Sequence, residues 1–409
     1  MQLLTVDTLD IARQKIFSYL QKETLLIEEK LLLDSQNCVL AQDIYAPFAV
    51  PHFKRSTVDG YAICHKDSIG VTESLPSFLK IIGKVEMGQE NTFSIKSGEC
   101  VYVPTGGMLP QGADSMIMLE YTEKLTEDEI AIYQNVAYNA GVVNIGEDME
   151  EKSLVLKKGT RLRPHEIGVL AALGITSVLV YAKPIVAIIS LGDEILAPEQ
   201  ELTMGKVYDI NSYGLYAQAK KFGFDVLSIT RVCDDRNQIK NTIIKLMQLA
   251  DIVVLSGGSS QGEKDFTASL LGELASSGVL THGIAIKPGK PTITAYDEFS
   301  KTLLLGLPGH PVAAMLLFEL LAQSVYNQLM DCKEENCIVA KMANNFPSAD
   351  GKLTCQLVDL IIQNKEYIAT PIFSKSGLIS SLAKAQGYIL VDMNTEGIKK
   401  DEQVLVHIL

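Results

Sequence analysis

Long apolar segments and an excess of basic residues are both missing from this 409-residue sequence. The longest apolar segment, residues 313–323, contains Glu319 and falls far short of the roughly 20 residues that cross a membrane. The formal net charge is −13, whereas broad binding of nucleic acid needs a basic surface. We therefore expect a cytoplasmic protein that binds neither a membrane nor nucleic acid. A small anionic ligand is still compatible with this charge, because a few lysines can make one pocket positive.

Cysteine motifs are also missing. None of the seven cysteines belongs to a CxxC pair, and their number is odd. Scattered cysteines of this kind favour reduced thiols in a cytosolic protein and disfavour a structural zinc site.

The N-terminus lacks the basic and apolar regions of a signal peptide. Asp7 is instead expected to cap an amphipathic helix. The apolar face of this helix would comprise Leu9, Ala12, Ile16, Phe17 and Leu20.

The pattern of strand-like and helix-like segments changes several times along the chain, which predicts a multidomain α/β protein. Residues 181–330 alternate strand-like and helix-like segments, so we expect a central α/β domain built on a parallel sheet. Short strand-like runs predict a mostly β domain over 47–140 and a small C-terminal β-barrel over 331–409. The remaining residues, 1–46 and 141–180, read as helical and predict a discontinuous linking domain.

A glycine-rich loop follows the third strand of the α/β domain, within VVLSGGSSQGEKDFTASLL (253–271). Such sheets bind ligands where loops leave the carboxyl ends of parallel strands. An anion suits this loop, because the glycines let the backbone approach it and the serines offer hydroxyl donors. The N–H groups at the start of the following helix also favour negative charge. The residues that would hold it are Gly257, Gly258, Ser259, Ser260 and Gly262. The spacing matches neither a P-loop nor GxGxxG, and a simple tight connection is the alternative.

A second turn of the same domain, IKPGKP (286–291), also points to an anion. Its two prolines stiffen a turn that presents Lys287 and Lys290, so the two ammonium groups have little freedom left to lose. An ordinary lysine-bearing surface turn is the alternative.

A third turn, GLPGHPVAA (306–314), ends a buried strand and begins a helix, and Pro308, Gly309 and Pro311 shape its backbone. Three turns rich in glycine or proline, one of them with paired lysines, together predict an anion cradle at one edge of the sheet.

Acidic residues gather at the same predicted edge. They are Asp193, Glu194, Asp209, Asp234, Asp235, Glu263 and Asp265. Each is a candidate helix cap, which is the commonest use of Asp at such positions. Carboxylates beside a phosphate also hold Mg²⁺. For that role we favour Asp265, with Asp234 and Glu194 as further ligands.

Seven motifs occur in order along the chain. They are PHFKRSTVDGYAI (51–63), PTGGMLPQGADSMIMLE (104–120), GED (146–148), LGDE (191–194), SGGSSQGEKDF (256–266), IKPGKP (286–291) and GLPGHPVA (306–313). Together they resemble the molybdopterin molybdenumtransferases (MoeA-type proteins), whose eukaryotic relatives include the gephyrin E-domain. The resemblance covers essentially the whole chain.

The resemblance implies an elongated four-domain homodimer whose substrates are adenylylated molybdopterin and molybdate, with Mg²⁺ as cofactor. AMP and active molybdenum cofactor would be the products. The glycine-rich loop would hold the phosphates, Lys287 and Lys290 would attract molybdate, and Asp265 would hold the metal. Cleavage of a phosphoanhydride needs positioning and charge neutralisation more than covalent chemistry. The upstream adenylyltransferase is a candidate partner.

The resemblance also implies that part of the cleft comes from the β domain of the partner subunit. The residues concerned are Asp59, Thr105 and Asp148, with Ser56, Tyr61 and Glu147 beside them. Two ordinary β-turns are the alternative interpretation.

In the C-terminal domain, Ser374 and Ser376 are implied to touch the ligand across the cleft, and a capped surface helix is the alternative. The sequence departs from the family pattern at His310 and Ala313, where the family often has Asn and Ser. Ala313 lacks the hydroxyl of a candidate oxyanion contact.

Two other functions fit parts of the sequence. A molybdopterin adenylyltransferase shares the α/β domain but is usually a short single domain. A non-catalytic, gephyrin-like scaffold needs partner-binding segments or a long linker, which we do not find here. We therefore expect the transferase.

Overall fold

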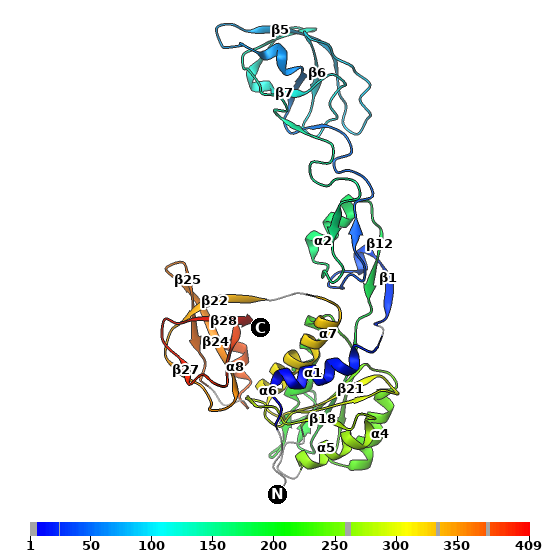
Figure 1. Ribbon diagram of the computed structural model, residues 1–409, viewed down its shortest axis with the longest axis vertical. Coiled ribbons are helices and arrows are strands. Elements are labelled where there is room, and N and C mark those ends of the chain that lie inside the picture. The colour runs from blue at the N-terminus through cyan, green and yellow to red at the C-terminus, as the bar shows by residue number, and fades with distance from the viewer. Residues whose placement is uncertain (1–5, 24, 258–262, 333–335, 374–376) are drawn as a thin grey trace. The chain divides into compact units, whose positions relative to one another are not determined.

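The computed structural model describes residues 6–23, 25–257, 263–332, 336–373 and 377–409, with the backbone alone for 263–265. These residues form two compact units (Figure 1). The first runs to Ala41 and continues through Gly159–Arg163 and Ser177–Leu409, and the second comprises Gln42–Lys158 and Pro164–Thr176. No helix within the described ranges is long and apolar enough to cross a membrane.

The first unit contains a six-stranded α/β sheet with strand order β16-β13-β17-β21-β20-β18. Four strands are mutually parallel: β13 (Ile185–Leu191), β16 (Asp225–Val232), β17 (Ile252–Gly257) and β21 (Thr302–Leu307). Strand β20 (Ile293–Asp297) pairs antiparallel with β21 on one side and with β18 (Val279–His282) on the other. The expected parallel sheet therefore carries an antiparallel edge.

Helices cover both faces of this sheet, because successive strand residues point to opposite sides. The helices are α3 (Ile210–Lys221), α4 (Arg236–Met247), α5 (Glu263–Leu274) and α6 (Pro311–Phe318) (Figure 1). On one face Ile188 packs in a core with Leu215 of α3 and Leu317 of α6. On the other, Ile189 packs with Ile243 of α4.

Helix α1 (Leu9–Leu20) packs on this α/β domain, with Ile16 in the same core as Ile188. The expected cap was wrong: Thr8 accepts the amide hydrogen bond of Ile11 at 3.3 Å. Asp7 lies one residue too early, and its carboxylate accepts from Lys15 Nζ at 2.6 Å and from Thr281 Oγ1 at 2.8 Å.

The stretch after α1 was expected to be helical and is largely extended. Strand β1 (Ile27–Leu31) pairs antiparallel with β12 (Ser177–Tyr181). The sequence IEEKL alternates exposed and half-buried residues, which is the period of a strand. Strand β2 (Ile44–Tyr45) pairs with β11 (Leu154–Leu156) in the second unit.

A closed five-stranded barrel forms the C-terminal part of the first unit, as expected. Its strands are β22 (Cys337–Met342), β24 (Leu353–Gln363), β25 (Glu366–Pro371), β26 (Gly387–Val391) and β28 (Gln403–Ile408). Closure comes from the pairing of β24 with β26, and β19 (Ile286–Lys287) adds to the free side of β24.

The second unit holds the predicted β domain. Its sheet has the order β7-β4-β6-β5-β9-β8. The strands are β4 (Gly60–Ile63), β5 (Ser77–Lys84), β6 (Glu99–Val103), β7 (Ser115–Met118), β8 (Thr122–Thr126) and β9 (Glu129–Ile132). The unit also contains α2 (Pro164–Ala172), which begins at proline and stops before Gly174, whose φ is 69°.

One half-buried acid joins the barrel to the α/β domain. Glu319 begins a π-helical turn, η4 (Glu319–Gln323), between α6 and α7 (Ser324–Leu329). Its carboxylate accepts from Tyr388 Oη of the barrel at 2.8 Å and from Gln218 Nε2 of α3 at 3.4 Å. Burial raises the pKa of Glu319 above its ordinary value, although both hydrogen bonds oppose the shift.

Glu319→Gln should remove a pH-dependent loss of stability. A raised pKa means that the folded protein binds the proton more tightly than the unfolded chain. The free energy of unfolding should therefore fall as pH rises from about 4.5 through the raised pKa, and level off above it. Thermal unfolding midpoints of the variant and wild type, measured across that range, should converge at low pH and separate at high pH. As a control, Glu199→Gln at an exposed position should show the same dependence of the unfolding midpoint on pH as wild type. If the curves of Glu319→Gln and wild type run parallel across the pH range, this account is wrong.

Candidate active site

The carboxyl ends of the parallel strands meet in register, and this leaves no space for a side chain at Gly257. Leu191 of β13 pairs with Gly257 of β17. A Cβ at Gly257 would lie 2.2 Å from Leu191 O, and the φ of 114° disfavours any residue with a side chain. The predicted loop therefore begins on bare backbone packed against its neighbour strand. Its next residues, Gly258, Ser259, Ser260 and Gly262, lie outside the described residues.

Asn211, in the first turn of α3, ties two of the predicted turns together. Its Nδ2 donates to Ser256 Oγ at 2.7 Å and to Gly309 O at 2.9 Å. Its Oδ1 is buried and has no hydrogen-bond partner among the described residues. Sequence reasoning missed this residue, because an Asn at a helix start reads as an ordinary cap-region residue.

The acids at this edge divide into two groups, and the first group caps helices. Asp209 accepts from the amide of Ser212 at 3.0 Å and from Arg231 Nε at 3.1 Å. Asp235 accepts from the amide of Gln238 at 2.7 Å. These contacts are the helix-cap use that the sequence left open.

The second group is exposed. Asp193 Oδ1 accepts from the amide of Asp234 at 3.1 Å, which joins the loops after β13 and β16. Glu194 and Asp234 are both exposed at this edge. Asp265 lies in the first turn of α5, but its side chain is outside the described structure. Among the described residues, no three candidate ligands converge here to within 4.8 Å.

A cavity of about 950 Å³ opens between the α/β domain and the barrel, both within the first unit. The α/β domain contributes the two predicted turns, with Lys287, Lys290, Pro308 and Gly309 on the wall. The barrel contributes residues that the sequence did not single out, namely Phe346, Lys352, Thr354, Gln356 and Phe373. The structure thus brings two turns of the α/β domain together with barrel residues that are distant in sequence.

Within the described part of the chain, three lysines line this cavity and none has a neutralising partner. Lys287 and Lys290 are exposed and Lys352 is half-buried. No ion pair within the described ranges involves any of the three. The cavity is therefore locally positive in a protein of net charge −13.

The lysine turn is held in place by close packing. A Cβ at Gly289 would lie 2.4 Å from Leu317 Cδ1, and the φ of Gly289 is 122°. On one side, Lys287 pairs with Thr354 of the barrel. On the other, the amide of Ile284 donates to Lys290 O at 3.0 Å. The two ammonium groups are thus carried by a fixed backbone.

The third turn follows β21. Pro308 is buried, and Pro311 is the first residue of α6, with His310 as its N-cap. Ala313 is buried and lies on the cavity wall. Ser374 and Ser376 fall outside the described residues, but a Cβ at the following Gly377 would lie 3.8 Å from His310 Cδ2.

In the second unit, the two predicted turns of the β domain contact each other. Asp59 Oδ1 accepts from the amide of Thr105 at 2.9 Å, and both residues are exposed. Ser56 and Tyr61 are buried, so the fold uses them for packing. Glu147 and Asp148 are also exposed.

Three family models match consecutive parts of the chain. They are the MoeA N-terminal region (domain I and II) over residues 7–174, the probable molybdopterin binding domain over 187–328, and the MoeA C-terminal region (domain IV) over 339–409. The chain belongs to the MoeA family. The family inferred from the sequence motifs is therefore confirmed.

Relatives of the MoeA family match along nearly the whole chain. A molybdopterin molybdenumtransferase of Haemophilus influenzae is 31% identical over 406 residues, covering 98% of each chain. One of Bacillus subtilis is 30% identical over 383 residues, covering 92% of this chain and 88% of the relative. The solved structure of a molybdopterin biosynthesis MoeA protein from Pyrococcus horikoshii has a TM-score of 0.84 at 29% identity, covering 99% and 100%. The predicted multidomain α/β fold is confirmed with it.

Gly257→Ala should destabilise the first unit more than Gly278→Ala. Both glycines have positive φ, but a Cβ meets backbone at Gly257 and nothing within 4 Å at Gly278. We expect a loss of about 1 kcal/mol at Gly278 from backbone strain alone, and clearly more at Gly257. Urea unfolding of the two variants measures the difference. Equal losses would show that the contact with Leu191 O relaxes freely.

Proposed function

We propose that this protein inserts molybdate into adenylylated molybdopterin and releases AMP and active molybdenum cofactor. The observation that carries the proposal is the cavity lined by Lys287, Lys290 and Lys352, which form no ion pair among the described residues. It is built from the motifs of a family whose relatives are molybdopterin molybdenumtransferases. Its volume, about 950 Å³, suits a nucleotide-sized ligand.

The lysines supply the charge that both substrates need. Lys287 and Lys290 stand on a fixed turn, so little entropy is lost when they bind an anion. Lys352 of the barrel also lines the cavity and supplies a third ammonium group. We assign molybdate to this lysine cluster, where positive charge also stabilises negative charge that develops as the phosphoanhydride is cleaved.

The phosphates fit the edge formed by Gly257 and the start of α5. Backbone amides at a helix N-terminus favour negative charge. Mg²⁺ is held in such sites by one or two carboxylates together with phosphate oxygens and water. The exposed carboxylates of Glu194 and Asp234 are hard oxygen donors of the right kind, and Asp265 at the start of α5 is the third candidate. When bound, the ion would neutralise charge on the leaving phosphate.

The pterin has both polar and aromatic partners available. Phe346 and Phe373 line the cavity with ring centroids 6.1 Å apart. Asn211 Oδ1 is a buried acceptor without a partner in the described structure, and it lies on the residue that joins the loop after β17 to Gly309. We assign the pterin to the aromatic wall, with Asn211 positioning the turns around the ligand.

Asp59, Thr105 and Asp148 would come from a partner subunit, so we propose a homodimer with shared clefts. The three residues are exposed on a unit separate from the lysine cavity. Helix α3 and the residues before it expose Tyr208, Ile210, Tyr213 and Tyr216, an apolar surface suited to a second copy. The upstream adenylyltransferase remains a candidate partner for delivery of the substrate. Adenylyltransfer and scaffolding are less well supported, because neither accounts for the barrel lysine in the cavity.

Lys290→Ala and Lys352→Ala should each lower molybdate-dependent AMP release by about a hundredfold, because each removes a charge from the site. Asp265→Ala should lower it comparably and weaken the response to Mg²⁺. The assay follows AMP from purified protein given adenylylated molybdopterin, molybdate and Mg²⁺.

Lys341→Ala is the matched control, since this barrel lysine pairs with Glu366 at 2.7 Å and lies outside the cavity lining. It should retain full activity. The proposal is wrong if all the cavity variants keep full activity, or if the folded wild type releases no AMP.

Mixed dimers should reveal the shared cleft. Asp59→Ala and Lys290→Ala proteins should each be nearly inactive, whereas coexpressed chains should recover about a quarter of wild-type activity, because half the dimers carry one intact cleft. Coexpression of Lys290→Ala with Lys352→Ala should recover nothing, since every cleft then keeps one lesion. Failure of the first pair to recover would show that each cleft is built within one chain.

A further inference from the structure

Three metal-binding residue types meet at one end of the β domain, away from the residues assigned to catalysis. Strands β4 and β7 are antiparallel, with Ile63 opposite Ser115. The residues just after β4 therefore face the residue just before β7, and the amide of Asp114 donates to Ile63 O at 3.1 Å. This pairing brings Cys64 and His65 to Asp114.

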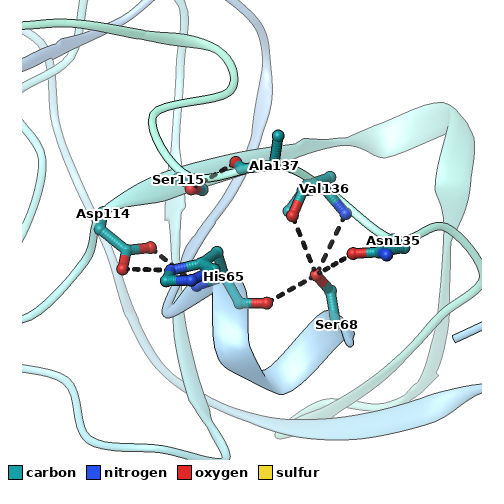
Figure 2. Close-up of polar contacts among 7 residues, drawn as sticks. All are labelled: His65, Ser68, Asp114, Ser115, Asn135, Val136 and Ala137. Carbon is teal, nitrogen blue, oxygen red and sulfur yellow. Dashed lines mark hydrogen bonds and ion pairs between the residues drawn. The ribbon is translucent and has the colours of Figure 1, made fainter. Parts of the chain in front are cut away.

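The His65–Asp114 contact is doubly fixed (Figure 2). Asp114 Oδ1 accepts the backbone N–H of His65 at 2.7 Å, and Oδ2 lies 2.6 Å from His65 Nδ1. Ser68 Oγ donates to His65 O at 2.7 Å, which closes the turn that carries the ring. The ring of Tyr138 packs edge-on against the imidazole, with centroids 5.4 Å apart. Both side chains of the pair are thus oriented before any ligand arrives.

Cys64 completes a set of three donors. One ligand atom each from Cys64, His65 and Asp114 lies within 4.8 Å of the others, and all three residues are half-buried. It is the one such group of His, Cys, Asp and Glu found within the described structure. Asp114 contributes a carboxylate oxygen to this set.

We propose that Cys64, His65 and Asp114 bind one divalent ion of the zinc class. Thiolate, imidazole and carboxylate are the ligands that zinc prefers, at about 2.0–2.3 Å. Donors around a tetrahedral ion at those distances stand roughly 3.3–3.8 Å apart. His65 Nδ1 and Asp114 Oδ2, now 2.6 Å apart, must therefore separate to admit the ion, while any donor near the 4.8 Å limit must move closer. The ion replaces the His65–Asp114 hydrogen bond: the imidazole binds through Nδ1 and keeps its one proton on Nε2, the thiol loses its proton to solvent, and water takes the fourth position.

A hydrogen-bonded pair without a metal is the competing explanation, and the barrel contains a similar feature. Cys337 Sγ lies 3.2 Å from His407 Nδ1, and no third ligand joins them within the described ranges. This second pair provides a control that has a thiol and an imidazole but belongs to no group of three candidate ligands in the described structure.

The experiment is a titration of the metal-free full-length protein with Co²⁺ in excess Mg²⁺, which occupies oxygen-donor sites. One equivalent should produce the near-ultraviolet thiolate-to-cobalt band and visible bands of four-coordinate cobalt, and Zn²⁺ should bleach them. Cys64→Ser should abolish the thiolate band. Asp114→Asn keeps an acceptor for the His65 amide but loses the charged ligand, and should weaken binding at least about tenfold.

Cys337→Ser should leave the titration unchanged, and circular dichroism checks that every variant is folded. The proposal is overturned if wild type shows no thiolate band, if the band survives in Cys64→Ser, or if it disappears in Cys337→Ser. Because the readout is cobalt absorption and not AMP release, its outcome is independent of the proposed transferase activity.

Discussion

The in-register pairing of parallel strands β13, β17 and β21 is the constraint on which the rest of the site depends. It brings the strand ends to one line, so the loops that leave them are neighbours whatever their distance in sequence. The contact between Gly257 and Leu191 O shows how closely the line is packed. Asn211 then fastens the end of β17 to the turn after β21 through two hydrogen bonds from one amide group.

The barrel depends on this arrangement in turn. Strand β19 belongs to the α/β part of the sequence, yet it pairs with β24 of the barrel. Tyr388 of the barrel donates a hydrogen bond to the half-buried Glu319, whose partial loss of solvent would be more costly without that partner. Together these contacts place Lys352 beside the lysine turn, so the positive cavity is a product of two domains.

Strong periodicity explains which parts were predictable from sequence. The strands and helices of residues 185–274 repeat buried runs and amphipathic helices, and they form nearly where expected. Strand β1 was missed because its charged residues resemble a helix surface, and its pairing with β12 decides the conformation. The cap at Thr8 was missed because Asp7 is the stronger candidate by residue type, but Lys15 and Thr281 engage its carboxylate instead.

The site shows the same division between local and long-range information. Lys287, Lys290 and the Gly/Pro turns could be predicted as an anion site because short local motifs contain them. The same motifs identified the family. Lys352 sits in a sequence, ADGKL, that reads as an ordinary turn, and only barrel closure brings it to the cavity. Asp114 is 49 residues from His65, so no spacing rule would join them, and β4–β7 pairing does so.

The placement of β19 also bears on how such proteins can be recombined. Lys287 is the last residue of a strand whose hydrogen-bonding partner lies in the barrel, and it also lines the cavity between the two domains. A chimaera that joins this α/β domain to a barrel from a relative would need a matching β24 edge at Leu353 and Thr354. Residue substitutions within that edge should therefore be coupled across the domain boundary.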